Sequence, residues 1–220
     1  MNKYPIVEKF VSINGEGSRA GQLAVFIRFH GCNLNCSYCD TKYANSNDAN
    51  YQLISEEELI SYLNNQGIKN ITLTGGEPLL QKNIDTLIQK LLALDYSVEI
   101  ETNGSVAIKP FISLHRPIFT LDYKLPASQM EAFMLLDNYQ YLTSNDVVKF
   151  VISDEFDLVK AKEIIFKHHL LDKAKIYFSP VFNQIDPKTI VAFMIDHQLN
   201  GINLQLQLHK YIWDVNQRGV

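Results

Sequence analysis

Three cysteines, Cys32, Cys36 and Cys39, lie within one eight-residue stretch, and no other cysteine occurs among the 220 residues of the chain. Their C-x3-C-x2-C spacing puts three thiol ligands on one short loop, enough for three corners of a cubane iron–sulfur cluster. A structural zinc site takes four ligands, and a [4Fe–4S] cluster usually takes four cysteines. Because a fourth cysteine is missing, the spacing predicts a cluster with one iron open to a ligand that is not protein.

Two other interpretations of the cysteine loop stay open at the level of the residues. His30 could complete a Cys3His zinc site, although it lies only two residues before Cys32, which is tight for a shared tetrahedral centre. The cysteines could also be buried free thiols. Since no second C-x2-C pair accompanies the loop, we favour the cluster.

A second segment with chemical potential, Thr74-Gly75-Gly76-Glu77-Pro78, directly follows a predicted strand. Paired glycines let a ligand approach the backbone closely, and the Glu77 carboxylate can accept hydrogen bonds from a cationic amine. Taken alone, the segment could equally be an ordinary strand-to-helix turn.

Composition excludes several classes of function. The chain is 46% apolar and 20% charged, with a net charge of −4 and no block of lysine or arginine, so nothing predicts a nucleic-acid or membrane partner. No apolar run reaches the roughly 18 residues of a transmembrane helix, and the N-terminal residues lack the apolar core of a signal peptide. An odd number of clustered cysteines argues against a disulfide framework. We therefore expect one globular domain over residues 1–220, located in the reducing cytoplasm.

The elements that must position these residues alternate between strand and helix. Strands are expected at Glu8–Ile13, Ala24–Phe29, Asn70–Thr74, Ser97–Glu101, Ile118–Asp122, Val147–Ile152, Lys175–Ser179 and Gly201–Gln205. Helices are expected after Ser55, with Glu58 completing a capping box and Gly67 as the stop, around Ile84–Leu92, and over Glu155–His168 and Pro187–Gln198.

Strand–helix–strand alternation predicts an α/β fold with parallel pairing and right-handed crossovers. A complete eight-fold barrel needs about 250 residues, and the first thirty residues of this chain precede any predicted helix. We therefore expect an incomplete, modified TIM-type (β/α) barrel with its site at the carboxyl ends of the strands. A doubly wound open sheet is the main alternative.

The cysteine loop, with an aromatic Tyr38 before its last cysteine, resembles the signature of the radical S-adenosylmethionine (SAM) superfamily. The Thr74–Pro78 segment resembles the GGEP motif of the same superfamily, in which the glutamate region meets the SAM ammonium group. The resemblance implies that the open iron binds the methionine part of SAM. The reduced cluster would then cleave SAM to a 5′-deoxyadenosyl radical.

Further segments resemble the 7-carboxy-7-deazaguanine synthase family over nearly the whole chain: Phe10–Gly17, Gly21, Phe26–Cys32, Cys39–Thr41, Glu101–Gly104 and Gln207–Lys210. This resemblance implies a lyase that converts 6-carboxy-5,6,7,8-tetrahydropterin to 7-carboxy-7-deazaguanine with loss of ammonia, on the way to queuosine. Hydrogen abstraction at C6 of the pterin would start the rearrangement. The resemblance also implies Mg2+, a homodimer and a reducing electron donor of the flavodoxin type.

The same resemblance assigns roles residue by residue. Substrate contacts are implied for Ile13, Asn14, Gly15, Glu16, Arg28, Thr102, Gln207 and His209, and Thr41 is implied as the magnesium ligand. The [4Fe–4S] cluster is assigned to the three cysteines. SAM contacts are implied for Tyr38, Cys39, Asp40, Gly75, Gly76, Glu77, Gly104, Asp122, Tyr123, Lys124 and Ser179. A guanidinium fork at Arg28 would suit the substrate carboxylate.

Several of these assignments have a plain structural alternative. Arg28 could be an outward strand residue, Thr41 and Asp40 could only hydrogen-bond the loop, and His209 could be structural. Gln207 and His209 are expected to alternate on an extended tail. Asp122-Tyr123-Lys124 departs from the Ser-Pro-Lys of many family members and keeps only the lysine.

Two rival functions remain to be discriminated. A small activase of a glycyl-radical enzyme would share the cluster but act on another protein, whereas the Asn14–Gly17 and Arg28 segments suit a small carboxylated substrate. A zinc-stabilised binding module would be colourless and contain no sulfide, so iron and sulfide analysis distinguishes it.

Overall fold

A single curved sheet of nine strands organises the described residues (2–46, 48–113, 115–215 and 217–220) of the computed structural model. The strands are β1 (Lys3–Ile13), β2 (Leu23–Phe29), β3 (Gln52–Ser55), β4 (Asn70–Gly75), β5 (Ser97–Thr102), β6 (Ile118–Tyr123), β7 (Val147–Ile152), β8 (Lys175–Pro180) and β9 (Ile202–Leu204). Their order in the sheet is β3-β1-β2-β4-β5-β6-β7-β8-β9.

Strand direction separates an N-terminal hairpin from a parallel barrel segment. β2 pairs in parallel with β4, and the parallel pairing continues strand by strand to β9. β1 runs antiparallel to both β2 and β3. The outer strands β3 and β9 do not pair with each other, so the sheet is open. This confirms the predicted incomplete barrel.

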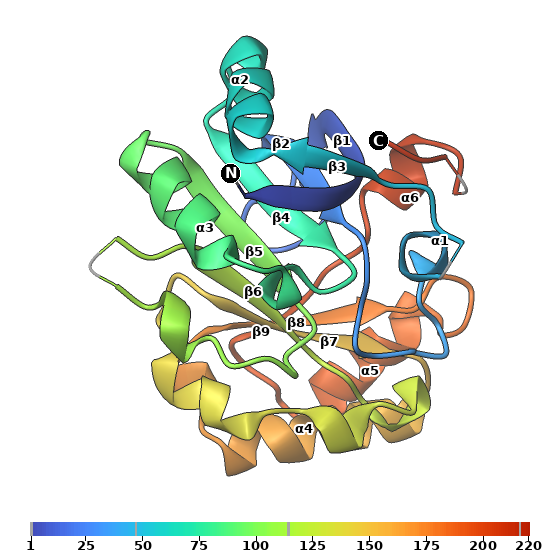
Figure 1. The fold of residues 1–220 in the computed structure, drawn as a ribbon. Coiled ribbons are helices and arrows are strands. Elements are labelled where there is room, and N and C mark those ends of the chain that lie inside the picture. The colour runs from blue at the N-terminus through green and yellow to red at the C-terminus, as the bar shows by residue number, and fades with distance from the viewer. Residues whose placement is uncertain (1, 47, 114, 216) are drawn as a thin grey trace.

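The four longer helices lie around the outside of the curved sheet, and the two short helices lie to one side of it (Figure 1). They are α1 (Lys42–Asn45), α2 (Glu56–Gln66), α3 (Ile84–Ala93), α4 (Glu155–Lys167), α5 (Pro187–Asp196) and α6 (His209–Ile212). The four longer helices match the predicted ones. In α2 the Ser55 hydroxyl accepts from the backbone of Glu58 while the Glu58 carboxylate accepts from the backbone of Ser55, and Gly67 ends the helix with a φ of 68°.

The strands have two faces of opposite character. In β4 the apolar Ile71 and Leu73 pack under the helices, whereas Thr72 and Thr74 alternate with them on the inner face. β5 and β6 repeat this alternation. Two carboxylates lie on the inner face of β5, and a threonine and a carboxylate lie on the inner face of β6. The apolar core therefore lies between sheet and helices, and the interior of the barrel is polar.

Three elements were not predicted from the sequence: β3, α1 and α6. The predicted extended tail around Gln207 and His209 is wrong, because Leu208 has helical dihedral angles (φ −54°, ψ −38°) and α6 begins at His209. The amide of Leu208 donates to the Gly15 carbonyl at 3.1 Å, which places this turn against the loop after β1. The C-terminal segment thus lies beside the N-terminal hairpin (Figure 1).

Candidate active site

A cavity of about 680 Å³ opens at the carboxyl ends of the parallel strands. Most of the predicted site residues line it: Ile13, Gly15, Glu16, Arg28, Cys32, Cys36, Tyr38, Cys39, Asp40, Thr41, Gly75, Gly76, Thr102, Asp122, Lys124, Gln207 and His209. Five predicted residues are not among its lining: Asn14, Glu77, Gly104, Tyr123 and Ser179. Segments that are far apart in the sequence therefore line one cavity.

The cysteine loop presents its sulfur atoms to this cavity with hydrogen-bond donors around them. Cys32 Sγ accepts from the Leu34 amide and from Asn103 Nδ2, both at 3.4 Å. Cys39 Sγ lies 3.6 Å from Thr41 Oγ1. Burial raises the pKa of the Cys36 thiol, so its thiolate form needs a positive partner such as iron. These donors and the missing fourth cysteine fit an iron–sulfur cluster with one open iron.

The zinc interpretation finds no support in the geometry. Within the described ranges, no group of three or more His, Cys, Asp or Glu side chains could hold a single metal ion. The ring of His30 stacks on Tyr51 at 4.6 Å between centroids, and its Nε2 lies 3.3 Å from the Ser46 carbonyl. His30 is therefore engaged away from the cysteines.

The two glycines at the end of β4 are required because other backbone atoms lie where their Cβ atoms would be. A Cβ on Gly76 would lie 1.8 Å from the Gly31 carbonyl oxygen, and one on Gly75 would lie 2.4 Å from the Phe29 carbonyl oxygen. Both glycines also border the cavity. The sequence predicted a close approach to the backbone at these glycines. In the structure, the start of the cysteine loop makes this close approach.

Glu77 differs from its prediction as a direct acceptor for a cationic amine. Its carboxylate is fully buried and accepts from the amides of Leu79 (3.0 Å) and Asn103 (2.7 Å) and from Thr102 Oγ1 (2.9 Å). Burial raises its pKa to about 7. The Glu77 side chain thus ties the turn after β4 to the end of β5 and does not face the cavity.

Arg28 reaches the cavity from β2 beside an acidic partner. Its Nε lies 3.0 Å from Glu8 Oε2, and Tyr43 donates to the same oxygen at 3.1 Å. Glu8 on β1 stands directly opposite Arg28 in the hairpin register. Because Glu8 engages Nε, the two terminal nitrogens of the guanidinium keep their parallel donors for a ligand carboxylate.

Glu16 is held at the mouth of the barrel by β7, by β8 and by the segment before α6. It accepts from Ser179 Oγ at 2.6 Å and from Gln207 Nε2 at 3.1 Å, and the Lys149 ammonium lies 3.4 Å away. Burial alone would raise the pKa of Glu16, but Lys149 and the two hydrogen bonds lower it. Ser179 therefore supports Glu16 by a hydrogen bond, whereas Ser179 itself does not line the cavity.

Of the two residues before Glu16 on the same turn, Gly15 lines the cavity and Asn14 does not. Asn14 is buried, and its Oδ1 accepts from Thr72 Oγ1 at 2.8 Å. Gly15 touches His209, whose Nδ1 would lie 2.5 Å from a Cβ at that glycine. Burial lowers the pKa of His209. Asn14 shapes the turn, while Gly15 and His209 lie together at the cavity wall.

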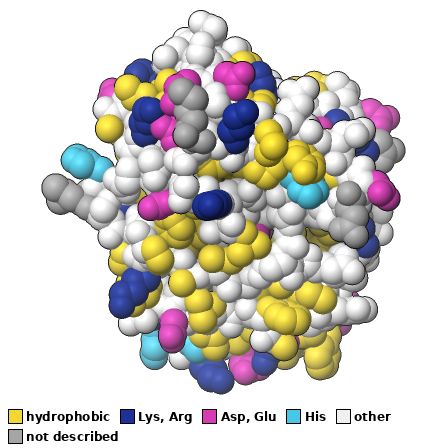
Figure 2. Space-filling model, viewed as in Figure 1, with side chains coloured by type: hydrophobic (Ala, Val, Ile, Leu, Met, Phe, Trp, Pro, Cys, Tyr) yellow, Lys and Arg dark blue, Asp and Glu magenta, His cyan; other side chains and the backbone are white. Residues whose placement is uncertain are grey.

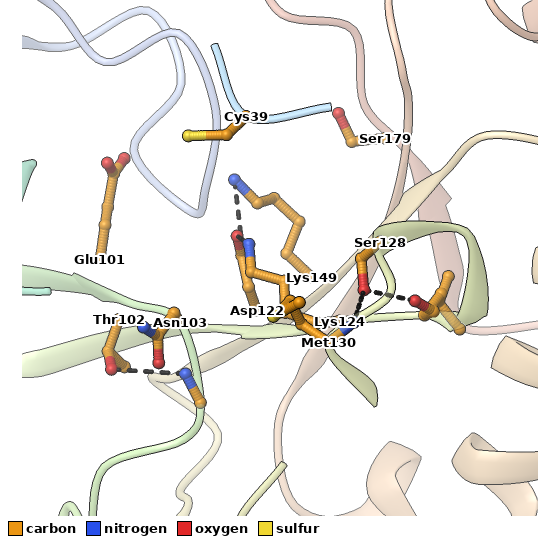
Figure 3. Close-up of polar contacts among 12 residues, drawn as sticks. Cys39, Glu101, Thr102, Asn103, Asp122, Lys124, Ser128, Met130, Lys149 and Ser179 are labelled. Carbon is orange, nitrogen blue, oxygen red and sulfur yellow. Dashed lines mark hydrogen bonds and ion pairs between the residues drawn. The ribbon is translucent and has the colours of Figure 1, made fainter. Parts of the chain in front are cut away.

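The Asp122-Tyr123-Lys124 segment points in two directions. Asp122 accepts from Lys124 Nζ at 2.6 Å and lies 3.3 Å from Lys149 Nζ, and these charges lower its pKa although burial would raise it (Figure 3). Tyr123 faces the core, and its hydroxyl donates to Glu131 at 2.8 Å. Only the two charged residues of this segment therefore border the cavity.

The remaining predicted SAM residues also separate into wall and support. Tyr38 lines the cavity, and its buried hydroxyl has no hydrogen-bond partner among the described residues. Gly104 lies behind the wall with a φ of 80°, where a Cβ would lie 2.4 Å from the Asp122 carbonyl oxygen. The Tyr38 side chain thus borders the cavity while its hydroxyl is buried.

Sequence reasoning missed several cavity residues, chiefly Lys149, Glu101, Thr74 and Asn103. Lys149 pairs with Asp122 in the register of β6 and β7, and Glu101 accepts from Thr74 Oγ1 at 2.6 Å. All but Asn103 occupy inward positions of parallel strands. The period of two in β4 and β5 was the signal that could have identified Thr74 and Glu101.

The comparisons with known proteins first define the class. The model of the Radical SAM superfamily matches residues 26–116, which contain the cysteine loop and the paired glycines. The crystal structure of QueE from Escherichia coli superposes with a TM-score of 0.72 at 23% identity, covering 93% of this chain and 94% of that one. Streptococcus suis SuiB bound to S-adenosylmethionine gives 0.59 at 11% identity over 83% and 50% of the two chains. Fold and site together define a radical SAM enzyme with a [4Fe–4S] cluster and SAM as cofactors.

Curated relatives then define the family. A 7-carboxy-7-deazaguanine synthase of Clostridium acetobutylicum is 57% identical over 99% of both chains. Those of Leptospira interrogans (36% identical; 99% of this chain, 98% of the relative) and Koribacter versatilis (32%; 98% and 99%) also match over nearly full length. The chain belongs to the 7-carboxy-7-deazaguanine synthase family.

Proposed function

We propose that this chain converts 6-carboxy-5,6,7,8-tetrahydropterin to 7-carboxy-7-deazaguanine with loss of ammonia. Full-length identity of 57% to a curated 7-carboxy-7-deazaguanine synthase is the observation that carries the proposal. The convergence of cysteines, Arg28 and Gln207 on one cavity supports it. The described chain would act as one radical SAM domain built on a single sheet.

The chain's own residues provide binding, orientation and exclusion of water. Cys32, Cys36 and Cys39 would hold the cluster, which together with SAM supplies the 5′-deoxyadenosyl radical. Tyr38, Asp40, Gly75, Gly76, Asp122 and Lys124 border the volume next to the cysteines and would surround SAM. Ile13, Gly15, Glu16, Thr102, Gln207 and His209 would surround the pterin.

Arg28 would fix the substrate carboxylate through its two terminal nitrogens, since Glu8 already engages Nε. Arg28→Lys keeps the charge but loses the bidentate fork, so we expect kcat/KM to fall by about tenfold to a hundredfold. Steady-state kinetics of the reconstituted enzyme measures this loss. Arg116→Lys is the matched control, because Arg116 pairs with Asp146 outside the cavity. An Arg28→Lys enzyme with unchanged kcat/KM would contradict the proposed role.

Thr41 would bind Mg2+ beside the substrate carboxylate. No cluster of acidic or histidine ligands exists among the described residues, so water and substrate would supply the other ligands. Thr41→Val removes the hydroxyl at almost constant shape, and we expect half-maximal activity to need about tenfold more Mg2+. Thr41→Ser keeps the hydroxyl and should retain the wild-type dependence. Identical magnesium titrations for Val and Ser variants would exclude Thr41 as a ligand.

The partners of the chain remain part of the proposal. We expect a homodimer, a flavodoxin-type electron donor and a cytoplasmic location. No helix among the described residues is both long and apolar enough to span a membrane. The surface in Figure 2 carries charged groups of both signs without a continuous basic patch. We expect no nucleic-acid partner, because the chain carries a net charge of −4.

An anaerobic assay tests the proposed reaction directly. Reconstituted protein is incubated with SAM, Mg2+, a chemical reductant and the carboxytetrahydropterin, and the product is identified by mass spectrometry. We expect 7-carboxy-7-deazaguanine and stoichiometric ammonia. A cluster-loaded protein that cleaves SAM but does not turn over this substrate would overturn the substrate assignment. A colourless protein with zinc and no sulfide would overturn the class.

A further inference from the structure

Lys149 lies at the centre of a charged network that the predicted site did not include. It occupies an inward position of β7, and its side chain is only 10% exposed. Its ammonium lies 3.4 Å from Glu16 Oε2 and 3.3 Å from Asp122 Oδ1. One buried cation thus lies between two partly buried carboxylates from different segments of the chain.

The two carboxylates come from different segments of the cavity wall. Glu16 lies on the turn after β1, where Ser179 and Gln207 also donate to it. Asp122 lies at the end of β6, where Lys124 donates to its other oxygen. Figure 3 shows Asp122 with the two lysines beside it, below Cys39 in this view. Lys149 therefore connects Glu16 and its hydrogen-bond donors to Asp122 and Lys124.

Charge balance explains why a cation is needed at this position. Glu16 and Asp122 carry two negative charges against the two positive charges of Lys124 and Lys149. Glu101, also inward, adds a third carboxylate nearby, and its hydrogen bond to Thr74 brings no positive charge. Without Lys149, the carboxylates would face one another in a poorly solvated site, which strongly disfavours their ionised forms.

We propose that Lys149 is a positioning residue that holds the substrate-side carboxylate Glu16 and the SAM-side carboxylate Asp122 in one fixed arrangement. The names of the two sides rest on the proposed function, whereas the electrostatic coupling does not. Lys149 acts through Glu16 and Asp122 and need not touch either ligand. Its loss releases Glu16 from one of its three partners and leaves Asp122 paired only with Lys124.

The first test uses the protein without cluster and measures unfolding by denaturant across pH 5 to 8. In the wild type, Glu16 and Asp122 have lowered pKa values, so their stabilising effect is complete above the unfolded pKa and is lost only on acidification. In Lys149→Met an unpaired carboxylate has a raised pKa, so stability is lost as pH rises. We expect the folding constant of Lys149→Met, relative to wild type, to be about tenfold lower at pH 8 than at pH 5.

Several groups besides Lys149 titrate or carry charge at this site: Glu16, Glu101, Asp122, Lys124 and His209. Lys149→Gln keeps a donor without the charge and should show the same trend. Glu16→Gln combined with Lys149→Met removes one carboxylate and should recover most of the loss, as a double-mutant cycle. Lys175→Met, on the exposed start of β8, is the matched control with a flat pH response. A pH-independent deficit in both Lys149 variants would show a packing role and overturn the proposal.

The second test measures binding on each side in cluster-loaded protein. SAM and the carboxytetrahydropterin are titrated separately by calorimetry, and we expect Lys149→Met to weaken both by at least about fivefold. Lys149→Arg, which keeps the charge, should restore part of both affinities. A loss confined to one ligand would overturn the joining role. If wild-type protein binds SAM but not this pterin, the proposed function fails, while the first test still decides the electrostatic coupling.

Discussion

Gly76 shows how one residue without a side chain fixes the position of the cluster loop. Its amide donates to the Phe29 carbonyl at 3.1 Å, and its Cα faces the Gly31 carbonyl so closely that a Cβ would lie 1.8 Å from that oxygen. Gly31 is the residue before Cys32. Glu77 then continues the contact, since its amide donates to the same carbonyl at 2.9 Å. The turn after β4 is thus a support for the cysteine ligands.

Gly76→Ala should therefore damage cluster binding. The added methyl must push the backbone at Gly31, and overpacking of this kind costs about 1–3 kcal/mol. We expect less than about half of the wild-type iron and sulfide after anaerobic reconstitution, and a lower unfolding midpoint. Gly67→Ala is the control for the effect of contact: unlike Gly76, Gly67 has a positive φ (68°), and no atom lies within 4 Å of an added Cβ there. It should lose about 1 kcal/mol of stability and keep its cluster. Full cluster content in Gly76→Ala would contradict this account.

At the scale of elements, α2 depends on its N-terminal cap. Ser55 and Glu58 exchange two hydrogen bonds, of 3.2 and 2.8 Å, that satisfy amides at the start of the helix. Ser55→Ala should lower the free energy of unfolding by about 1 kcal/mol, measured by denaturant titration, without changing KM. Glu58→Gln preserves the capping box and should cost less. Equal losses for the two variants would mean that the Ser55 hydroxyl is not the essential acceptor.

The elements also show what sequence could predict. Local signals, such as this capping box and the spacing of Ile84, Leu87 and Ile88 in α3, gave correct helices, because their causes lie within one turn. β3 escaped because its four residues are largely exposed at a sheet edge and show no alternation. The turn at Leu208 escaped because a hydrogen bond to Gly15, distant in sequence, sets its conformation.

The residues of the site also fall into those that the sequence could predict and those that it could not. Motifs identified the cysteines, Arg28 and the paired glycines, which all line the cavity. Lys149 was missed because a lysine in a strand reads as an exposed residue until its two carboxylate partners, from other segments, are known. For Glu77, only the fold shows that two backbone amides and Thr102 already donate to its carboxylate.

At the scale of the whole molecule, a polar barrel interior makes stability depend on pH. Glu99 lies deeper in the barrel than Glu101, with 1% exposure. Thr120 donates to its Oε1 at 2.6 Å, while its Oε2 has no partner among the described residues. Burial raises the pKa of Glu99 to about 7, as it does for Glu77. Burial lowers the pKa of His168 and His209, which acts in the opposite direction on stability.

Comparison of Glu99→Gln with wild type isolates one of these groups. A carboxyl with a raised folded pKa contributes its full stability below the unfolded value, near 4.5, and loses it as pH rises through about 7. Relative to Glu99→Gln, the wild type should therefore lose up to about 3 kcal/mol between pH 4.5 and pH 8. Denaturant unfolding of the cluster-free proteins at several pH values measures this difference, in which the histidine contributions cancel. Glu131→Gln, at a partly exposed carboxylate, provides a reference with a much smaller pH response. A stability difference between Glu99→Gln and wild type that stays constant across this range would show that Glu99 is ionised at acid pH despite its burial.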